Sequence, residues 1–207
     1  MNEIKILHLS DTHGMHRRLT ELPSADILVH SGDFTMMGTM PEALDFLDWL
    51  CDMPYRHKVF IAGNHDTCLY KAYVNGLDDN VYYLSNSGVV IEGLYFWGVP
   101  LFMEDCINEQ QDKNFSDIPD STDILVTHVP PLGILDIDDG IHYGSKVLLE
   151  RIKQIKPELH LFGHIHKANG VFRNDVTAFS NAAIMDEHYD RFQNPHILSL
   201  QDGWRDA

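Results

Sequence analysis

Five short polar patches, each placed directly after a short apolar run, constrain this chain more than any other feature. The patches are Asp11-Thr-His13, Gly32-Asp33, Gly63-Asn64-His65-Asp66, Thr127-His128 and Gly163-His164-Ile-His166. The apolar runs that precede them are residues 4–9, 27–30, 59–62, 124–126 and 159–162. Short apolar runs of this kind are typical of buried strands. Because packing alone does not explain a polar patch at the end of each strand, we expect the patches to form one site.

Helix signals occur in two places. Thr39 and Glu42 have the spacing of a capping box, and Pro41 suits the first turn of the helix that should follow. A second helix is expected over residues 146–155, where apolar side chains recur at helical spacing and Ser145 can cap the first turn. The first expected helix therefore follows the apolar run at 27–30, and the second follows the run at 124–126.

The remaining apolar segments predict further strands. Residues 81–84, 89–91 and 94–99 suggest an antiparallel meander or hairpin, and 171–172, 176–179 and 196–200 suggest closing strands. Residues 101–122 are polar and irregular, which predicts an active-site loop. Strand–helix alternation around a hairpin region predicts an α/β fold, a mixed β-sandwich flanked by helices, as a single domain over residues 1–207. In such sheets the ligand site lies beyond the carboxyl ends of the strands, where all five patches fall.

Charge and composition limit the kinds of molecule that this chain is expected to bind. The formal net charge is −16, from 31 acidic against 15 basic residues. This balance argues against a nucleic-acid partner and against anionic membrane surfaces, and leaves a small-molecule substrate as the expected partner, with the oligomeric state open. The N-terminal residues show no signal pattern, and no apolar run is long enough to cross a bilayer. Three cysteines with no CxxC spacing, Cys51, Cys68 and Cys106, favour a cytoplasmic location.

The spacing within two patches favours ligands for metal ions. Asp11 and His13 are two residues apart, and residues i and i+2 of an extended segment point to the same side. One strand end could therefore offer a carboxylate and an imidazole to a single centre, and His164 and His166 would repeat that geometry. The glycines of the patches, Gly32, Gly63 and Gly163, permit tight turns and close backbone approach at the strand ends.

The ligand types indicate a pair of divalent ions. Asp33 is suited to bridging two metals because a carboxylate has two oxygens, and Asn64 adds a neutral amide oxygen. The set mixes oxygen and nitrogen without thiolate, which suits Mn, Fe, Zn, Ni or Co, with Mn favoured. A metal pair about 3.5–4 Å apart stabilises both oxygens of an in-line displacement at phosphorus, and a metal-bound hydroxide would attack. The expected chemistry is hydrolysis of a phosphate ester.

Taken in order, the patches resemble a known family. The longer motifs are Ile61-Ala-Gly-Asn-His-Asp66, Thr127-His-Val-Pro-Pro-Leu-Gly133 and Leu159-His-Leu-Phe-Gly-His-Ile-His166. They are similar to those of the calcineurin-like metallophosphoesterases, and more narrowly to the small branch that includes the brain-expressed metallophosphoesterase-domain proteins. The resemblance covers about residues 4 to 200 and implies that fold, with a metal-dependent phosphoric ester hydrolase activity.

The resemblance also implies a role for each patch residue. The ligands of the first metal would be Asp11, His13, Asp33 and His166. The ligands of the second metal would be Asp33, Asn64, His128 and His164, with Asp33 bridging the two. His65 would not be a ligand; it would stabilise the transition state or protonate the leaving oxygen, and Asp66 would fix its tautomer. The alternatives are a hydrogen-bonded loop residue for His65 and a turn former or helix cap for Asp66.

One departure bears on the substrate. After Gly32-Asp33 the chain reads Phe34-Thr-Met-Met-Gly38, whereas Ser/Thr protein phosphatases have Asp-Arg-Gly there. The arginine that grips the phosphate is absent, so a small phosphodiester is favoured over a phosphoprotein. The alternatives are a phosphomonoesterase, a nuclease, and a catalytically silent metal-binding scaffold of the same fold. The acidic balance disfavours the nuclease, and loss of ligands would mark the scaffold, but all seven predicted ligands are present.

Three side chains near the patches have two readings each. Phe34 is expected either as a pocket wall or as part of the core. For His16 and His142, an exposed loop position is favoured over a place in the pocket.

Overall fold

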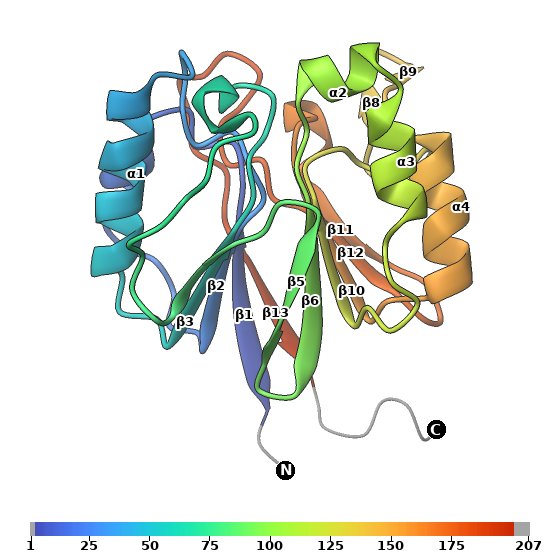
Figure 1. The fold of residues 1–207 in the computed structure, drawn as a ribbon, viewed down its shortest axis with the longest axis horizontal. Helices are drawn as coiled ribbons and strands as arrows, with labels where there is room; N and C mark the ends of the chain where they lie inside the picture. Colours follow the sequence, from blue (N-terminus) through green and yellow to red (C-terminus); the bar gives the residue numbers. More distant parts are fainter. Residues whose placement is uncertain (1–2, 201–207) are drawn as a thin grey trace.

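Two β-sheets pack face to face between two layers of helices (Figure 1). The computed structural model describes residues 3–200. In spatial order, the first sheet comprises β13 (His196–Leu200), β1 (Ile4–Leu9), β2 (Ile27–His30), β3 (His57–Phe60) and β4 (Val81–Tyr83). The second comprises β11 (Gly170–Arg173), β12 (Ala178–Asn181), β10 (Leu159–Phe162), β7 (Ile124–Thr127), β6 (Leu94–Val99) and β5 (Ser87–Ile91). β8 (Ile137–Asp138) and β9 (Ile141–His142) form a separate hairpin.

The helices cover the outer faces of both sheets (Figure 1). They are α1 (Met40–Asp52), α2 (Met103–Ile107), α3 (Gln110–Ser116) and α4 (Lys146–Ile155), with short 3-10 turns η1 (His16–Arg18), η2 (Thr67–Leu69) and η3 (His166–Ala168). Helix α1 packs on the first sheet through Phe46 and Leu50, and α3 and α4 pack on the second through Phe115 and Leu148. The predicted mixed α/β sandwich flanked by helices is confirmed.

Alternation along the strands builds the core between the sheets. In β1, Leu7 and Leu9 face α1, whereas Ile6 faces the second sheet and packs with residues such as Ile124 and Leu161. Successive side chains of a strand point to opposite faces, so a strand buried on both faces is apolar throughout. β1 to β4 run parallel to one another, as do β6, β7, β10 and β12, so their carboxyl ends gather at one end of the sandwich.

Both predicted helix starts are confirmed. Thr39 Oγ1 accepts a hydrogen bond from the backbone N–H of Glu42, and the Glu42 carboxylate accepts one from the Thr39 N–H, which completes the capping box. Ser145 caps α4 by accepting from the Leu148 N–H at 3.1 Å. These caps satisfy N–H groups that have no partner inside the helix.

Of the antiparallel meander or hairpin predicted over residues 81–99, the hairpin is confirmed and the meander is wrong. β4 pairs in parallel with β3 in the first sheet, and only β5 and β6 form a hairpin, in the second sheet. Apolar alternation marks a strand but does not state which neighbour it pairs with. Strand ends also shift: the run expected at 59–62 is a strand over His57–Phe60, and the one expected at 176–179 covers Ala178–Asn181.

The segment 101–122 is not an irregular loop, since it contains α2 and α3. Neither helix has a side-chain cap at its start, so the usual start signal is missing. In α3 the inward face carries two buried polar residues, Gln111 and Asn114, beside Phe115, which conceals its amphipathic pattern. Residues 1–2 and 201–207 of the predicted domain lie outside the described residues. Within 3–200, no helix is long and apolar enough to cross a membrane.

Candidate metal centre

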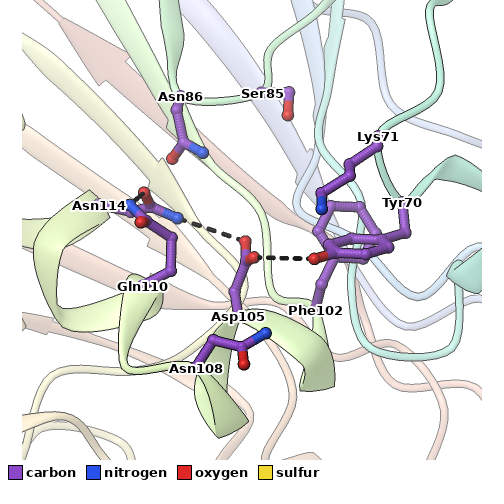
Figure 2. Close-up of a pocket in the computed structure, with 9 residues that line it drawn as sticks. All are labelled: Tyr70, Lys71, Ser85, Asn86, Phe102, Asp105, Asn108, Gln110 and Asn114. Carbon is purple, nitrogen blue, oxygen red and sulfur yellow. Dashed lines mark hydrogen bonds between the residues drawn. The ribbon is translucent and has the colours of Figure 1, made fainter.

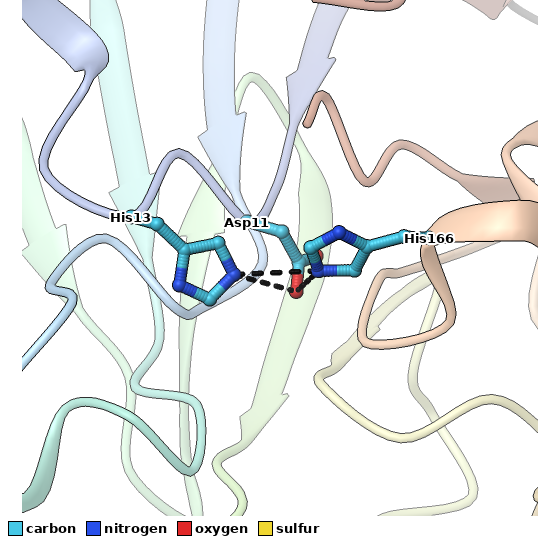
Figure 3. A group of neighbouring side chains, drawn as sticks. All are labelled: Asp11, His13 and His166. Atoms are coloured by element: carbon cyan, nitrogen blue, oxygen red, sulfur yellow. Dashed lines mark hydrogen bonds and ion pairs between the residues drawn. The ribbon is translucent and has the colours of Figure 1, made fainter. Parts of the chain in front are cut away.

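The carboxyl ends of β1, β2, β3, β7 and β10 bring the five patches together between the two sheets. One cluster consists of Asp11, His13 and His166, which point toward one another in Figure 3. The Nε2 atoms of His13 and His166 lie 3.3 Å apart, and Asp11 Oδ1 lies 3.9 and 3.5 Å from them, respectively. Two imidazole nitrogens and a carboxylate oxygen facing one another at these distances suit a cation between them.

A second cluster lies beside the first. It comprises Asp33, His128 and His164, and His128 Nε2 lies 3.2 Å from Asp33 Oδ2. The same nitrogen is 4.0 Å from Asp11 Oδ1, so the clusters are in contact. Asp33 also groups with His13 and His65, again with ligand atoms within 4.8 Å of one another. Asp33 therefore reaches ligands on both sides.

Several buried polar atoms at this place lack a hydrogen-bond partner among the described residues. They are Asp11 Oδ1, His13 Nδ1, Asn64 Oδ1 and His128 Nε2. A buried polar atom without a partner costs free energy, so such atoms are rare unless an ion or water completes them. All four belong to predicted ligands, and carboxylate oxygen, amide oxygen and imidazole nitrogen are the atom types that bind divalent ions. The residues present therefore fit the metal ions that the sequence predicts.

The backbone at the ligands is left-handed. The φ angles are 56° at Asp11, 43° at His13, 57° at Asp33 and 71° at His164. Non-glycine residues in this region cost about 1–3 kcal/mol each and persist where the surroundings hold them, often at functional sites. The extended-segment reasoning for the two spaced pairs is therefore wrong. Asp11 and His13 still meet in one cluster, but His164 and His166 join different clusters.

Backbone carbonyls set the tautomers of two histidines. The Nδ1 of His128 lies 2.8 Å from Ser31 O, and the Nδ1 of His166 lies 3.1 Å from Asp186 O. Because a carbonyl oxygen only accepts hydrogen bonds, both Nδ1 atoms carry the proton. Nε2 is then the ring nitrogen that faces the site, as in metal centres where an outer partner fixes the ligand ring.

Backbone N–H groups hold the two carboxylates. The His164 N–H donates to Asp11 Oδ2 at 2.9 Å, and the His65 N–H donates to Asp33 Oδ1 at 2.8 Å. In each case the other oxygen points toward the histidines. The carboxylates are therefore oriented before any ion binds.

The buried carboxylates of the site favour a nearby positive charge. Burial lowers the pKa of His128, but Asp33 and Asp11 outweigh it and raise that pKa to about 10. Burial and the neighbouring His128 lower the pKa of His164 to about 4. Burial raises the pKa of Asp11, yet the imidazoles around it, His128 foremost, bring that pKa below its usual value. A divalent ion would supply the positive charge that these carboxylates otherwise draw from His128.

The structure places Asp66 differently from the prediction. Its carboxylate accepts hydrogen bonds from the N–H groups of Asp33, Gly63 and Thr35 at 2.8, 2.8 and 2.9 Å. It neither contacts the ring of His65 among the described contacts nor caps η2 through its side chain. Burial, followed by the nearby Asp33, raises the Asp66 pKa to about 7. Asp66 ties together the two loops that carry Asp33 and Asn64.

The ring of His65 is instead oriented by a carbonyl. Its Nδ1 lies 2.9 Å from Met36 O, and its ring stands edge-on to that of His13, with centroids 4.7 Å apart. The sequence could not indicate Met36, because its contribution comes from the backbone. Tyr189 was also missed: its ring packs against those of His13 and His166 at 4.9 and 5.0 Å, from a loop with no recognisable motif.

The structure decides between the two interpretations of Phe34, His16 and His142. Phe34 is fully buried and stacks on Phe46, so it belongs to the core. His16 is buried, not exposed, because it packs on Phe46 and lies 2.9 Å from the Asp45 carboxylate. His142 is exposed, as expected.

Two glycines pack directly against the carboxylates. A Cβ built on Gly163 would collide with Asp11 Oδ2, and one built on Gly63 would collide with Asp33 Oδ1. Neither glycine has a positive φ, so the close approach, not the backbone angle, requires glycine there. The close approach predicted at these two glycines is confirmed, and the atoms that approach are carboxylate oxygens of predicted ligands.

Substituting Gly163→Ala is therefore expected to displace Asp11 and lower metal affinity by about 10- to 100-fold, the usual cost of disturbing a ligand's support. Metal titration by calorimetry measures this. Gly170→Ala is the control, because a Cβ at Gly170 would meet its nearest atom at an ordinary 3.6 Å. Equal affinities for the two variants would contradict the steric reading.

Cavities open near the clusters. One of about 190 Å³ is lined by Asp33, Asn64, His65, His164 and His166, together with Tyr189. A second, of about 380 Å³, adjoins it through Asn64 and His164. A third, of about 470 Å³, is a polar recess between Tyr70 and α2–α3 (Figure 2), where Asp105 contacts Tyr70 and Asn114. None of the predicted ligands lines that recess.

Comparisons with known proteins identify the family of this chain. Residues 4–168 match the calcineurin-like phosphoesterase family. A UPF0046 protein of Caenorhabditis elegans is 32% identical over 87% of this chain and 69% of its own length. Human metallophosphoesterase domain-containing protein 1 is 30% identical over 93% of this chain and 69% of its own. A conserved uncharacterized protein of Streptococcus pneumoniae of known structure covers 98% of this chain and 86% of its own, with a TM-score of 0.48 and 15% identity. The chain therefore belongs to the calcineurin-like phosphoesterase family, and is a phosphoric ester hydrolase with a site for divalent metal ions.

Proposed function

We propose that the chain hydrolyses small phosphodiesters at a centre of two divalent ions. The observation that carries the proposal is the position of Asp33, whose carboxylate groups with His13 on one side and with His128 and His164 on the other. A single carboxylate within reach of ligands on both sides is suited to bridging two metals. The first ion would be held by Asp11, His13, Asp33 and His166. The second would be held by Asp33, Asn64, His128 and His164.

The ligand chemistry supports a first-row transition metal, and we propose Mn²⁺. Structural zinc sites usually include thiolate ligands, whereas this set of carboxylate, amide and imidazole donors suits Mn²⁺ and similar ions. Cellular supply then decides which of these ions is bound. When bound, such ions lower the pKa of water and offset the charge of a phosphate. The protein's own part is to hold the donor atoms in place, through the N–H groups of His164 and His65 and the carbonyls of Ser31 and Asp186.

The charges around the smaller cavity favour a diester over a monoester. Asp138 and Glu187 line it, and no Lys or Arg is among its described lining residues. The nearby Lys167 ammonium is engaged by Asp138 and Asp139 at 2.8 and 2.7 Å. A phosphomonoester near neutral pH carries close to two negative charges, and a diester carries one. The dianion would meet carboxylates without a fixed side-chain cation to offset them.

His65 is suited to proton transfer at the leaving oxygen. Met36 O accepts a hydrogen bond from its Nδ1–H, which leaves Nε2 as the nitrogen available to substrate in the smaller cavity. In the imidazolium form of the ring, Nε2 also carries a proton, and this is the proton that passes to the leaving oxygen. A general acid must lie within hydrogen-bond reach of the group it protonates, and a cavity that it lines meets that condition.

The test is hydrolysis of bis(4-nitrophenyl) phosphate by the purified protein with Mn²⁺. Turnover is expected, with loss in EDTA and recovery on adding metal. Asn64→Ala and His128→Ala should each abolish it, since each removes a ligand atom that has no other partner among the described residues. His188→Ala, at an exposed histidine outside the site, should keep full activity. Undiminished turnover by both ligand variants in EDTA would overturn the proposal.

A further inference from the structure

The larger cavity beside the metal centre adjoins the smaller one. Its volume is about 380 Å³, and it shares Asn64 and His164 with the smaller cavity. Its remaining walls come from the α2–α3 segment and from residues that follow β7. Both shared residues are proposed ligands of the second ion. A substrate whose phosphate lies over the metals can therefore extend one of its groups into this space.

The inner wall of the larger cavity is apolar. Leu101, Phe115 and Val129 line it, and Met103, which is 54% exposed, lies at its edge. Burying apolar surface contributes roughly 25 cal/mol per Å². This wall therefore favours a group with an apolar body, and a cavity of this size accommodates an aromatic ring.

Three polar side chains that the α2–α3 segment supplies to the same cavity present acceptor oxygens. Gln111 is only 6% exposed, and its Nε2 donates to Pro100 O at 3.1 Å. Its Oε1 is buried without a partner among the described residues. Glu109 and Asp112 add two carboxylates, and no Lys or Arg is among the described lining residues. A bound group that donates hydrogen bonds or carries positive charge would match these acceptors, whereas an anion would be repelled.

His65 indicates which part of a diester enters the larger cavity. It lines the smaller cavity and does not line the larger one. If His65 protonates the leaving oxygen, the leaving alcohol lies on its side of the phosphate. The second alcohol group, which stays on phosphorus, then extends past Asn64 and His164.

We propose that this larger cavity binds the retained organic group of a phosphodiester, and that it selects neutral or cationic groups with an apolar body over anionic ones. The inference rests on the proposed function, and names the substrate class of the same site. The α2–α3 segment is thereby a specificity element: it supplies Met103, Glu109, Gln111, Asp112 and Phe115.

The test uses 4-nitrophenyl phosphodiesters that share the leaving group and differ in the retained group. The retained groups are methyl, phenyl, 4-(aminomethyl)phenyl and 4-carboxyphenyl. We expect kcat/KM at least about tenfold higher for phenyl than for methyl, from burial of the ring. The kcat/KM of the aminomethyl ester should be about threefold to tenfold higher than that of the carboxyl ester, which is the size of effect expected from interaction with two partly exposed carboxylates.

Two sets of variants locate the effect. Glu109→Gln with Asp112→Asn should bring the aminomethyl-to-carboxyl ratio close to one. Glu104→Gln with Asp117→Asn, which removes the same charge from the same segment outside the cavity, should leave the ratio unchanged. Met103→Ser should lower the phenyl-to-methyl ratio about threefold. Ile107→Ser, at an exposed position of the same helix, should not change it.

The methyl ester separates the two levels of the proposal. It needs only the smaller cavity, so lack of turnover on every ester with every metal would overturn the proposed function. Turnover of all four esters at equal rates, or ratios that respond equally to the cavity variants and their controls, would overturn this inference and leave the function intact.

Discussion

Replacing Asp33 with asparagine is expected to lower kcat/KM for bis(4-nitrophenyl) phosphate by at least about a thousandfold, because a bridging ligand contributes several kcal/mol through the metals it holds. Metal content should fall from two ions per chain to one or none. An amide oxygen can still accept the His65 N–H bond, but it carries no charge and donates on its other side. Activity assays and elemental analysis measure both effects.

Thermal melting of the metal-free variant distinguishes this loss from unfolding. Burial and the neighbouring Asp11 raise the pKa of Asp33, but His128 outweighs them and lowers that pKa overall, so the fold stabilises the ionised carboxylate. Removing the charge takes away the partner of His128, so the metal-free variant should melt at a lower temperature than the metal-free wild type but still in one cooperative transition. Asp48→Asn, at an exposed carboxylate paired with Arg17, is the matched control and should keep activity and metal. Full metal content with full activity in Asp33→Asn would rule out a bridging role.

The second large effect is expected for His65→Ala. A positioned general acid contributes about 10²- to 10⁴-fold, so kcat should fall in that range for an ester with a poor leaving group such as an alkoxide. The loss should be much smaller for 4-nitrophenolate, which leaves without a proton. Metal content should stay at two ions per chain, because the proposed ligand set does not include His65.

This pattern distinguishes acid catalysis from metal binding. A ligand atom of His65 lies within 4.8 Å of those of His13 and Asp33, so proximity alone does not exclude it as a ligand. If His65→Ala loses an ion, or if both leaving groups suffer equally, the residue is a ligand or a structural support. His142→Ala, at an exposed histidine bonded to Asp136, should behave as wild type in every assay.

The sequence was informative where chemistry and periodicity coincide. The patches lie at the ends of the strands, so the predicted strands also indicated which side chains would come together. All seven predicted ligands lie at one end of the sandwich. The capping signals at Thr39 and Ser145 located both long helices because a cap is a local feature. Strand pairing was harder: residues 81–83 joined the other sheet, a choice made by packing partners far along the chain.

Other parts of the site could not be read from residue types. The left-handed backbone at Asp11 and His164 is imposed by the surrounding structure, since neither residue type demands it. The carbonyls of Ser31, Met36 and Asp186 orient histidines through backbone atoms that every residue has. Asp66 has the right chemistry for a partner of His65, but its carboxylate is taken up by backbone N–H groups.

Anomalous diffraction from crystals grown with Mn²⁺ tests the central claim most directly. We expect two peaks about 3.5–4 Å apart, with Asp33 touching both. The coordination of one ion should be completed by Asp11, His13 and His166, and that of the other by Asn64, His128 and His164. A single peak, or two peaks of which Asp33 touches at most one, would contradict the account.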